Sequence, residues 1–158
     1  MGVGNLLMGD EGVGVHAVRR LQRENLPAGV DLLDGGTGGF HLLSYFQDYA
    51  DIVMIDATMD GNPAGTLRVI HPKFASDFPR TLAAHDIGLR DLVEAASLLG
   101  GLRNITLITV SIEIVKSMDM SLSPEVAKAV EKIPALLGPI LNDHRCREKS
   151  AAEVNVPY

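Results

Sequence analysis

Short apolar runs alternate with helical patterns along this chain, and this alternation constrains the fold more than any other feature of the sequence. Residues 52–55 are branched and apolar, residues 30–33 are similar apart from Asp31, and residues 105–110 form the clearest strand pattern. Residues 66–70 alternate weakly, which indicates an antiparallel strand. The sequence therefore predicts one α/β domain with a mostly parallel sheet.

Helical spacing is seen in two stretches before the last strand pattern. Apolar residues recur on one face of residues 12–24. A second stripe, over residues 89–96, stops at Gly100 and Gly101, a common signal for the end of a helix. Both stretches are predicted to be helices that cover the sheet.

The last helix has a clear start signal, because Ser123 suits the N-cap and Pro124 the first helical position. Pro134 and Pro139 interrupt the apolar pattern that follows, so we expect a kinked or split helix.

The two ends of the chain are unusual. Residues 2–3 reach a turn-like Gly4 and Asn5 almost at once, so we expect a first strand that is short or truncated. Residues 1–143 are predicted to form the domain, and the polar residues 144–158 a flexible C-terminal tail.

Charge and composition exclude several classes of protein. The net charge is -6 and no basic stripe is present, which excludes a generic nucleic-acid binder. No apolar run is long enough to cross a membrane, and the N-terminal residues lack a signal-peptide pattern. The single Cys146 has no partner for an internal disulfide, which favours a reducing compartment, so we predict a cytoplasmic protein.

Three residues stand where catalytic or metal-binding groups often lie. Glu11 lies where the first loop meets the first helix, Asp56 follows a predicted buried strand, and His85 precedes a later helix. Each has an ordinary alternative, as a helix-dipole partner, a turn residue or a surface histidine respectively. Together they would form an oxygen and nitrogen ligand set that suits nickel or zinc and leaves positions open for a substrate. Beside Glu11, Asp10 is predicted to cap the first helix.

The glycines near these residues allow other interpretations. Gly12, Gly14 and Ala17 match the dinucleotide-binding pattern G-x-G-x-x-A, but the acidic residues that precede them would repel a pyrophosphate. The glycine-dense residues 34–39 either bring backbone close to another chain or form a plain turn.

Several motifs in order carry a resemblance to a known family. The series of residues 2–5, 10–14, 34–38, 55–57, 85–89, 111–113 and 122–126 resembles the nickel-iron hydrogenase maturation endopeptidases. The resemblance implies a twisted, mostly parallel sheet between helices. It also implies that Glu11, Asp56 and His85 bind nickel carried by the substrate. It further implies that the protein removes the C-terminal extension from a hydrogenase large-subunit precursor after nickel insertion. Ile114 departs from the family pattern, which commonly has proline there.

The resemblance also implies a reaction class. Such enzymes are hydrolases often classed with aspartic-type peptidases, and Asp56 is a candidate general base by residue type. A non-proteolytic nickel-binding accessory protein would use the same three ligands and is the alternative function.

Overall fold

Three strands form a mixed sheet in the part of the chain that the computed structural model describes, residues 1–37, 39–72, 77, 93–95, 98 and 104–153. β1 (Asp51–Thr58) pairs in parallel with β3 (Asn104–Ser111), and β2 (Leu67–Ile70) pairs antiparallel with the other side of β3. All three strands lie where the apolar patterns predict them. The predicted antiparallel strand at residues 66–70 is thus confirmed as β2.

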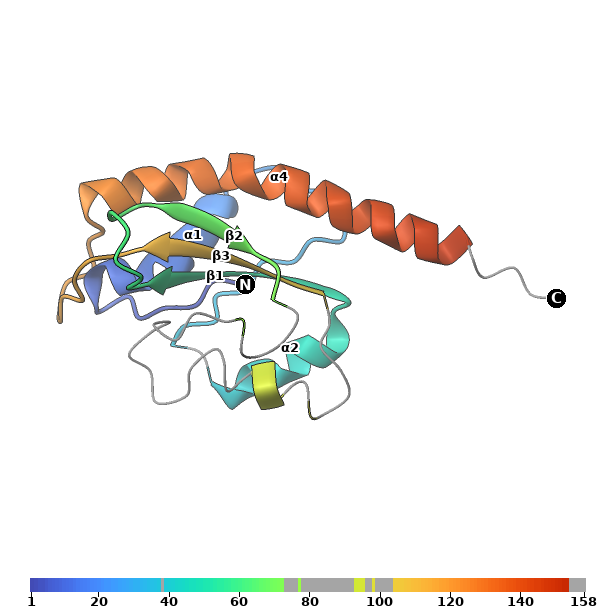
Figure 1. Ribbon diagram of the computed structural model, residues 1–158, viewed down its shortest axis with the longest axis horizontal. Coiled ribbons are helices and arrows are strands. Elements are labelled where there is room, and N and C mark those ends of the chain that lie inside the picture. The colour runs from blue at the N-terminus through green and yellow to red at the C-terminus, as the bar shows by residue number, and fades with distance from the viewer. Residues whose placement is uncertain (38, 73–76, 78–92, 96–97, 99–103, 154–158) are drawn as a thin grey trace.

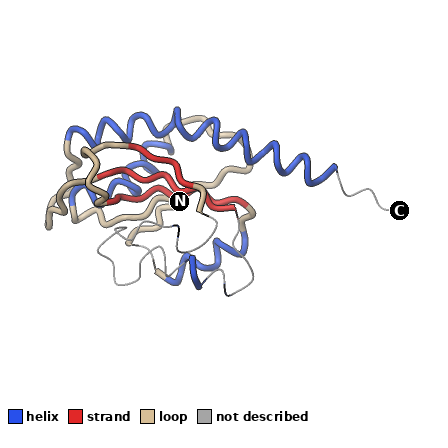
Figure 2. The backbone as a smooth tube through the Cα atoms, viewed as in Figure 1, coloured by secondary structure: helices blue, strands red, loops and turns tan. Residues whose placement is uncertain are grey.

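Helices cover both faces of this sheet (Figure 1). α1 (Val13–Leu21) follows the short 3-10 helix η1 (Gly9–Gly12), and it packs on one face together with α4 (Pro124–Glu153). The opposite face is covered by η2 (Phe40–Leu42) and α2 (Leu43–Asp48). Figure 2 shows the same arrangement, with the strands between the two groups of helices. The predicted α/β architecture is confirmed.

Alternation along β1 supplies the two apolar cores, because successive strand side chains point to opposite faces. Ile52 and Met54 pack with Phe46 of α2. Ile55 and Ala57 belong to the core on the other face, which includes Val13 of α1. β1 is therefore buried on both faces, as expected for a strand flanked by helices on each side.

The N-terminal residues lie beside β1 and take the place of a regular first strand. Met1 O accepts a hydrogen bond from Ile55 N (2.9 Å), and Val3 N donates to Ile55 O (2.9 Å). On the other side, Gly2 N donates to Leu33 O (2.9 Å) and Gly35 N donates to Gly2 O (2.8 Å). Gly2 is thus bridged in parallel to Ile55 and to Asp34.

The prediction of a strand at residues 30–33 is wrong, since in the described chain these residues form no strand. A strand needs a neighbour that supplies backbone partners, and the N-terminal segment pairs with the residues around Asp34 instead. Val30 and Leu32 line a cavity of about 430 Å³, with Met1 and Val53 also in its wall.

The last predicted helix is observed as α4. α4 begins at Pro124 as predicted and runs without a break through Pro134 and Pro139, so of the two predicted alternatives, a kinked or a split helix, the split is wrong. Its apolar residues pack on the sheet, and this tertiary packing stabilises the helix despite the prolines. The backbone of α4 also continues beyond residue 143, to Glu153. No described helix combines the length and apolar composition needed to cross a membrane.

The predicted helix at residues 89–96 lies mostly outside the described residues. Within it, residues 93–95 are helical, and Val93 is buried in the core that contains α2.

Candidate functional site

Asp56 is a fully buried carboxylate near the carboxyl end of β1. Its Oδ1 accepts a hydrogen bond from Ala57 N (2.8 Å). Its Oδ2 is buried and has no hydrogen-bond partner among the described residues. Because an unpaired buried carboxylate oxygen is costly, this atom is a candidate for contact with a cation or a proton.

The sheet face that carries Asp56 changes from apolar to polar along the strands. Ile52 and Met54 precede Asp56 on this face, and Thr58 follows it. On β3 the register partner of Asp56 is Thr109, whose hydroxyl is buried and without a hydrogen-bond partner in the described chain. The polar side chains Thr58, Thr109 and Ser111 were not predicted as site residues. The available sequence signal was that Thr58 stands two positions after Asp56, and Ser111 two positions after Thr109, so that each pair lies on one face of its strand.

Glu11 lies in η1 and is also buried, at 1% exposure. It is close enough to Asp56 for its charge to raise the pKa of that carboxyl. Two of the three predicted ligand residues are therefore near one another. His85 lies outside the described residues.

Close backbone packing brings η1 and α1 against the strands. A Cβ atom at Gly14 would lie 2.2 Å from Val3 O and 2.3 Å from Ile55 O. A Cβ at Gly4, whose φ is +147°, would lie 2.1 Å from Glu11 O. Only glycine permits these approaches, and both place Glu11 near Asp56. The glycines that resembled a dinucleotide fingerprint thus have a packing role in this fold.

The electrostatics of the pair follow from burial. Burial raises the pKa of Asp56 well above 3.8, and the negative charge of Glu11 raises it further, while the Ala57 N–H opposes this shift. A bound divalent cation would remove the repulsion between the carboxylates, and carboxylate oxygens are suitable ligands when joined by an imidazole. In the described part of the chain, no group of three or more His, Cys, Asp or Glu side chains gathers around such a site.

Asp10 does not cap the first helix, contrary to the prediction. Its Oδ1 accepts a hydrogen bond from Ser123 N (2.6 Å), immediately before α4. α1 has Gly12 at its N-cap and no side-chain cap. Asp10 therefore connects the loop that carries Glu11 to the start of α4, a contact that sequence spacing could not indicate.

The glycine-dense loop is fixed to the same region. Asp34 Oδ1 accepts a hydrogen bond from Gly36 N (3.0 Å), as in an Asx turn. Gly36 O accepts one from Gly4 N (2.7 Å), so this part of the loop lies beside the N-terminal segment that borders Glu11. The turn interpretation therefore holds for this part of the loop.

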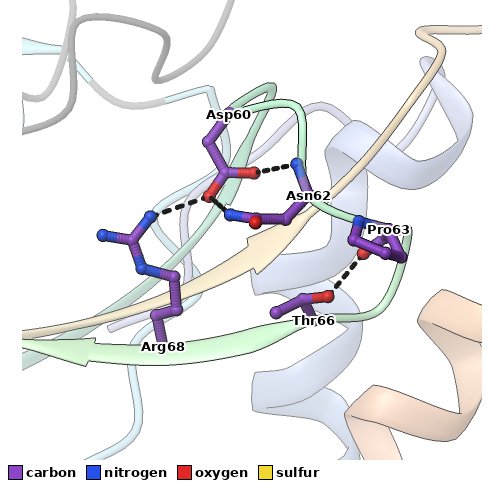
Figure 3. Close-up of polar contacts among 5 residues, drawn as sticks. All are labelled: Asp60, Asn62, Pro63, Thr66 and Arg68. Atoms are coloured by element: carbon purple, nitrogen blue, oxygen red, sulfur yellow. Dashed lines mark hydrogen bonds and ion pairs between the residues drawn. The ribbon is translucent and has the colours of Figure 1, made fainter.

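The turn after β1 is held by Asp60, and Figure 3 shows its contacts. Asp60 Oδ1 accepts from Asn62 N (3.1 Å), while Oδ2 accepts from Asn62 Nδ2 (2.8 Å) and Arg68 Nη1 (3.0 Å). Burial alone would raise the pKa of Asp60, but its hydrogen bonds, first those from Asn62, lower it to about 2. Asp60 is the turn residue, and Asp56 belongs to the strand, so the turn interpretation of Asp56 is wrong.

The fold and site define an α/β protein with a buried carboxylate pair at one edge of its sheet. A family model described as hydrogenase maturation protease matches residues 15–138. The hydrogenase expression/formation protein HoxM of Azotobacter vinelandii is 34% identical over 142 residues, which cover 86% of this chain and 67% of that protein. The hydrogenase 2 maturation protease of Escherichia coli K12 is 34% identical over 140 residues, covering 86% and 84%.

A solved structure of a hydrogenase maturating endopeptidase is also similar to this chain. The hydrogenase maturating endopeptidase HybD from E. coli matches with a TM-score of 0.80 and 31% identity, over 90% of each chain. The chain spans about half the length of several curated relatives that it matches. This chain belongs to the hydrogenase maturation protease family, which confirms the family predicted from its ordered motifs.

Proposed function

We propose that this chain is an endopeptidase that removes the C-terminal extension from the large-subunit precursor of a nickel-iron hydrogenase after nickel has been inserted. In this proposal the nickel belongs to the substrate, and Glu11, Asp56 and His85 bind it. Membership of the family supports the reaction class. The name of the E. coli relative, a hydrogenase 2 maturation protease, supports a hydrogenase as the source of the substrate.

The observation that carries the proposal is the buried Asp56 Oδ2 beside Glu11, without a hydrogen-bond partner among the described residues. A cation presented by the substrate would compensate this oxygen, which the described protein groups do not. Carboxylate oxygens and an imidazole together suit nickel. The part given to His85 rests on the sequence resemblance alone.

The proposed reaction is hydrolysis of one peptide bond. Water adds its oxygen to the scissile carbonyl carbon, the C–N bond breaks, and the departing amine gains a proton. Asp56 is the proposed base for the attacking water, a role worth about 10²–10⁴-fold in rate for a well-placed group. The aspartic-type classification rests on the family resemblance, because a site of two carboxylates and a histidine is not the paired-aspartate arrangement.

The setting of the reaction is part of the proposal. The single Cys146 favours a reducing compartment, and we place the protein in the cytoplasm with the precursor as its partner.

Mass spectrometry of a nickel-loaded precursor, beside a nickel-free precursor, tests the proposal directly. We expect loss of a C-terminal peptide only from the nickel-loaded sample. Nickel uptake in a fixed ratio without any peptide release would instead favour the non-proteolytic accessory protein.

Three substitutions and one control variant test whether Glu11, Asp56 and His85 are needed for cleavage. Glu11→Gln, Asp56→Asn and His85→Ala should each abolish cleavage. Asp48→Asn should retain it, because Asp48 is exposed at the end of α2. Cleavage at the wild-type rate in any of the first three variants would remove that residue from the proposed site.

A further inference from the structure

Large apolar side chains are exposed in the loops at the carboxyl ends of β1 and β3. They are Leu7, Met59, Ile114, Met118 and Met120, here called the apolar rim. Exposed apolar residues are usually scattered singly, whereas a set gathered at one edge marks an interaction site. Three of the five are methionines, whose flexible side chains adapt to irregular protein surfaces.

Backbone hydrogen bonds join these loops. Asp119, between Met118 and Met120, donates from its N to Leu7 O (3.2 Å) and accepts at its O from Gly9 N (2.6 Å). Ile112 N donates to Thr58 O (2.8 Å), which joins the loop after β3 to the residue before Met59. In Figure 1 these loops lie together at the arrowheads of β1 and β3.

The rim borders the candidate site on two sides. Leu7 lies just before η1, which carries Glu11. Met59 directly follows β1, which carries Asp56. A protein whose backbone reaches Asp56 from this edge must pass the rim loops.

Met118 has the feature that is hardest to explain without a partner. Its φ of 60° is the only left-handed value of a non-glycine residue in the described chain, and its side chain is 86% exposed. Such a backbone is strained and persists only where its surroundings impose it. The exposed side chain gains little from burial within this chain, so the loop holds it outward at a cost.

We propose that the apolar rim is the docking surface for the hydrogenase large-subunit precursor, which it contacts through an apolar surface beside the C-terminal extension. This inference rests on the proposed function. The precursor is the occupant that the position favours, because its scissile segment has to enter between the rim loops to reach Asp56. A second copy of this chain would have no such reason to face the site.

The test compares Met118→Gly and Met118→Ser with Leu98→Ser. Leu98 is 85% exposed, like Met118, but lies in the segment before β3. Both Met118 variants should raise KM for the nickel-loaded precursor about tenfold with little change in kcat, as expected for loss of one apolar contact in the bound complex. Leu98→Ser should leave both constants unchanged. Met118→Gly should also raise Tm, because glycine adopts a positive φ without strain, so a misfolded protein could not explain its higher KM.

Each outcome decides one of the two proposals. A wild-type KM in both Met118 variants would overturn the docking surface and leave the protease intact. If the wild-type chain cleaves nothing, but its Kd for the precursor rises about tenfold in Met118→Gly, the docking surface stands and the protease falls. A concentration-dependent dimer in sedimentation that is lost in Met118→Gly would overturn docking, because the rim would then join two copies.

Discussion

Gly14 of α1 packs against the carbonyl oxygen of Ile55 in β1, at a position where a Cβ atom would come within 2.3 Å of that oxygen. Ile55 directly precedes Asp56, and Glu11 lies one turn before Gly14. This contact therefore helps to hold the two carboxylates of the candidate site near each other.

Gly14→Ala should destabilise the fold, because the methyl group would meet the backbone oxygens of Val3 and Ile55. Overpacking of this kind costs about 1–3 kcal/mol. Chemical denaturation measures the loss. Gly138→Ala is the matched control, since a Cβ at position 138 meets nothing within 4 Å, and it should raise stability by up to about 1 kcal/mol. Equal effects of the two substitutions would contradict the close approach.

Asp56→Asn should stabilise the protein at neutral pH while it abolishes cleavage. The substitution removes a buried carboxyl whose pKa is raised in the folded state by burial and by the charge of Glu11, so the folded chain no longer bears the cost of that shifted protonation equilibrium. For a chain of this length, each kcal/mol changes Tm by roughly 2–4 °C.

The pH dependence of this gain has a definite sign. Because the pKa of Asp56 is raised in the folded state, the unfolded state releases its proton at a lower pH. The wild-type chain thus loses stability relative to Asp56→Asn as pH rises above 3.8, the ordinary pKa of the carboxyl. Below that pH the difference should vanish. A difference that is constant with pH would show that charge is not its cause.

Asp60→Asn should have the opposite dependence on pH. Hydrogen bonds lower the pKa of Asp60 to about 2, so its contribution is present above the ordinary value of 3.8 and is lost as pH falls toward 2. Solvent screening limits the loss in the variant to less than about 1 kcal/mol. Measuring the free energy of unfolding of Asp56→Asn and Asp60→Asn across the acid range checks both predicted signs. If the two variants showed the same pH dependence, the opposite pKa shifts of Asp56 and Asp60 would be contradicted.

Asp10→Ala should weaken the start of α4, because Asp10 accepts the hydrogen bond from Ser123 N. Loss of a comparable capping contact costs about 1 kcal/mol. Amide hydrogen exchange should show faster exchange at Ser123 and in the first turn of α4. Asp48→Ala, at an exposed position, should change stability by no more than about 0.5 kcal/mol. Unchanged exchange at Ser123 in Asp10→Ala would contradict the link.

Most of the sheet could be predicted from local pattern. The runs at residues 52–55 and 105–110 are branched and apolar, and they form β1 and β3. Residues 30–33 have a similar pattern but form no strand in the described chain, because a strand also needs a neighbour with matching backbone groups. Pattern likewise located α4 but not its continuity, which packing against the sheet maintains through two prolines.

The candidate site was also only partly predictable from the sequence. Glu11 and Asp56 could be selected by residue type and by their places beside a helix and a strand. Their burial could not, and neither could the partnership of Asp10 with Ser123 across 113 positions of sequence. Thr109 was missed because its nearness to Asp56 depends on the register of β1 against β3.

By itself the sequence determined the family, the fold class and the residues able to carry charge at the sheet edge, because these depend on residue type, order and local periodicity. The tertiary structure decided that Glu11 and Asp56 are buried near each other and that the pKa of Asp56 is raised. Burial and charge separation set such shifts, and both arise only when distant segments pack together.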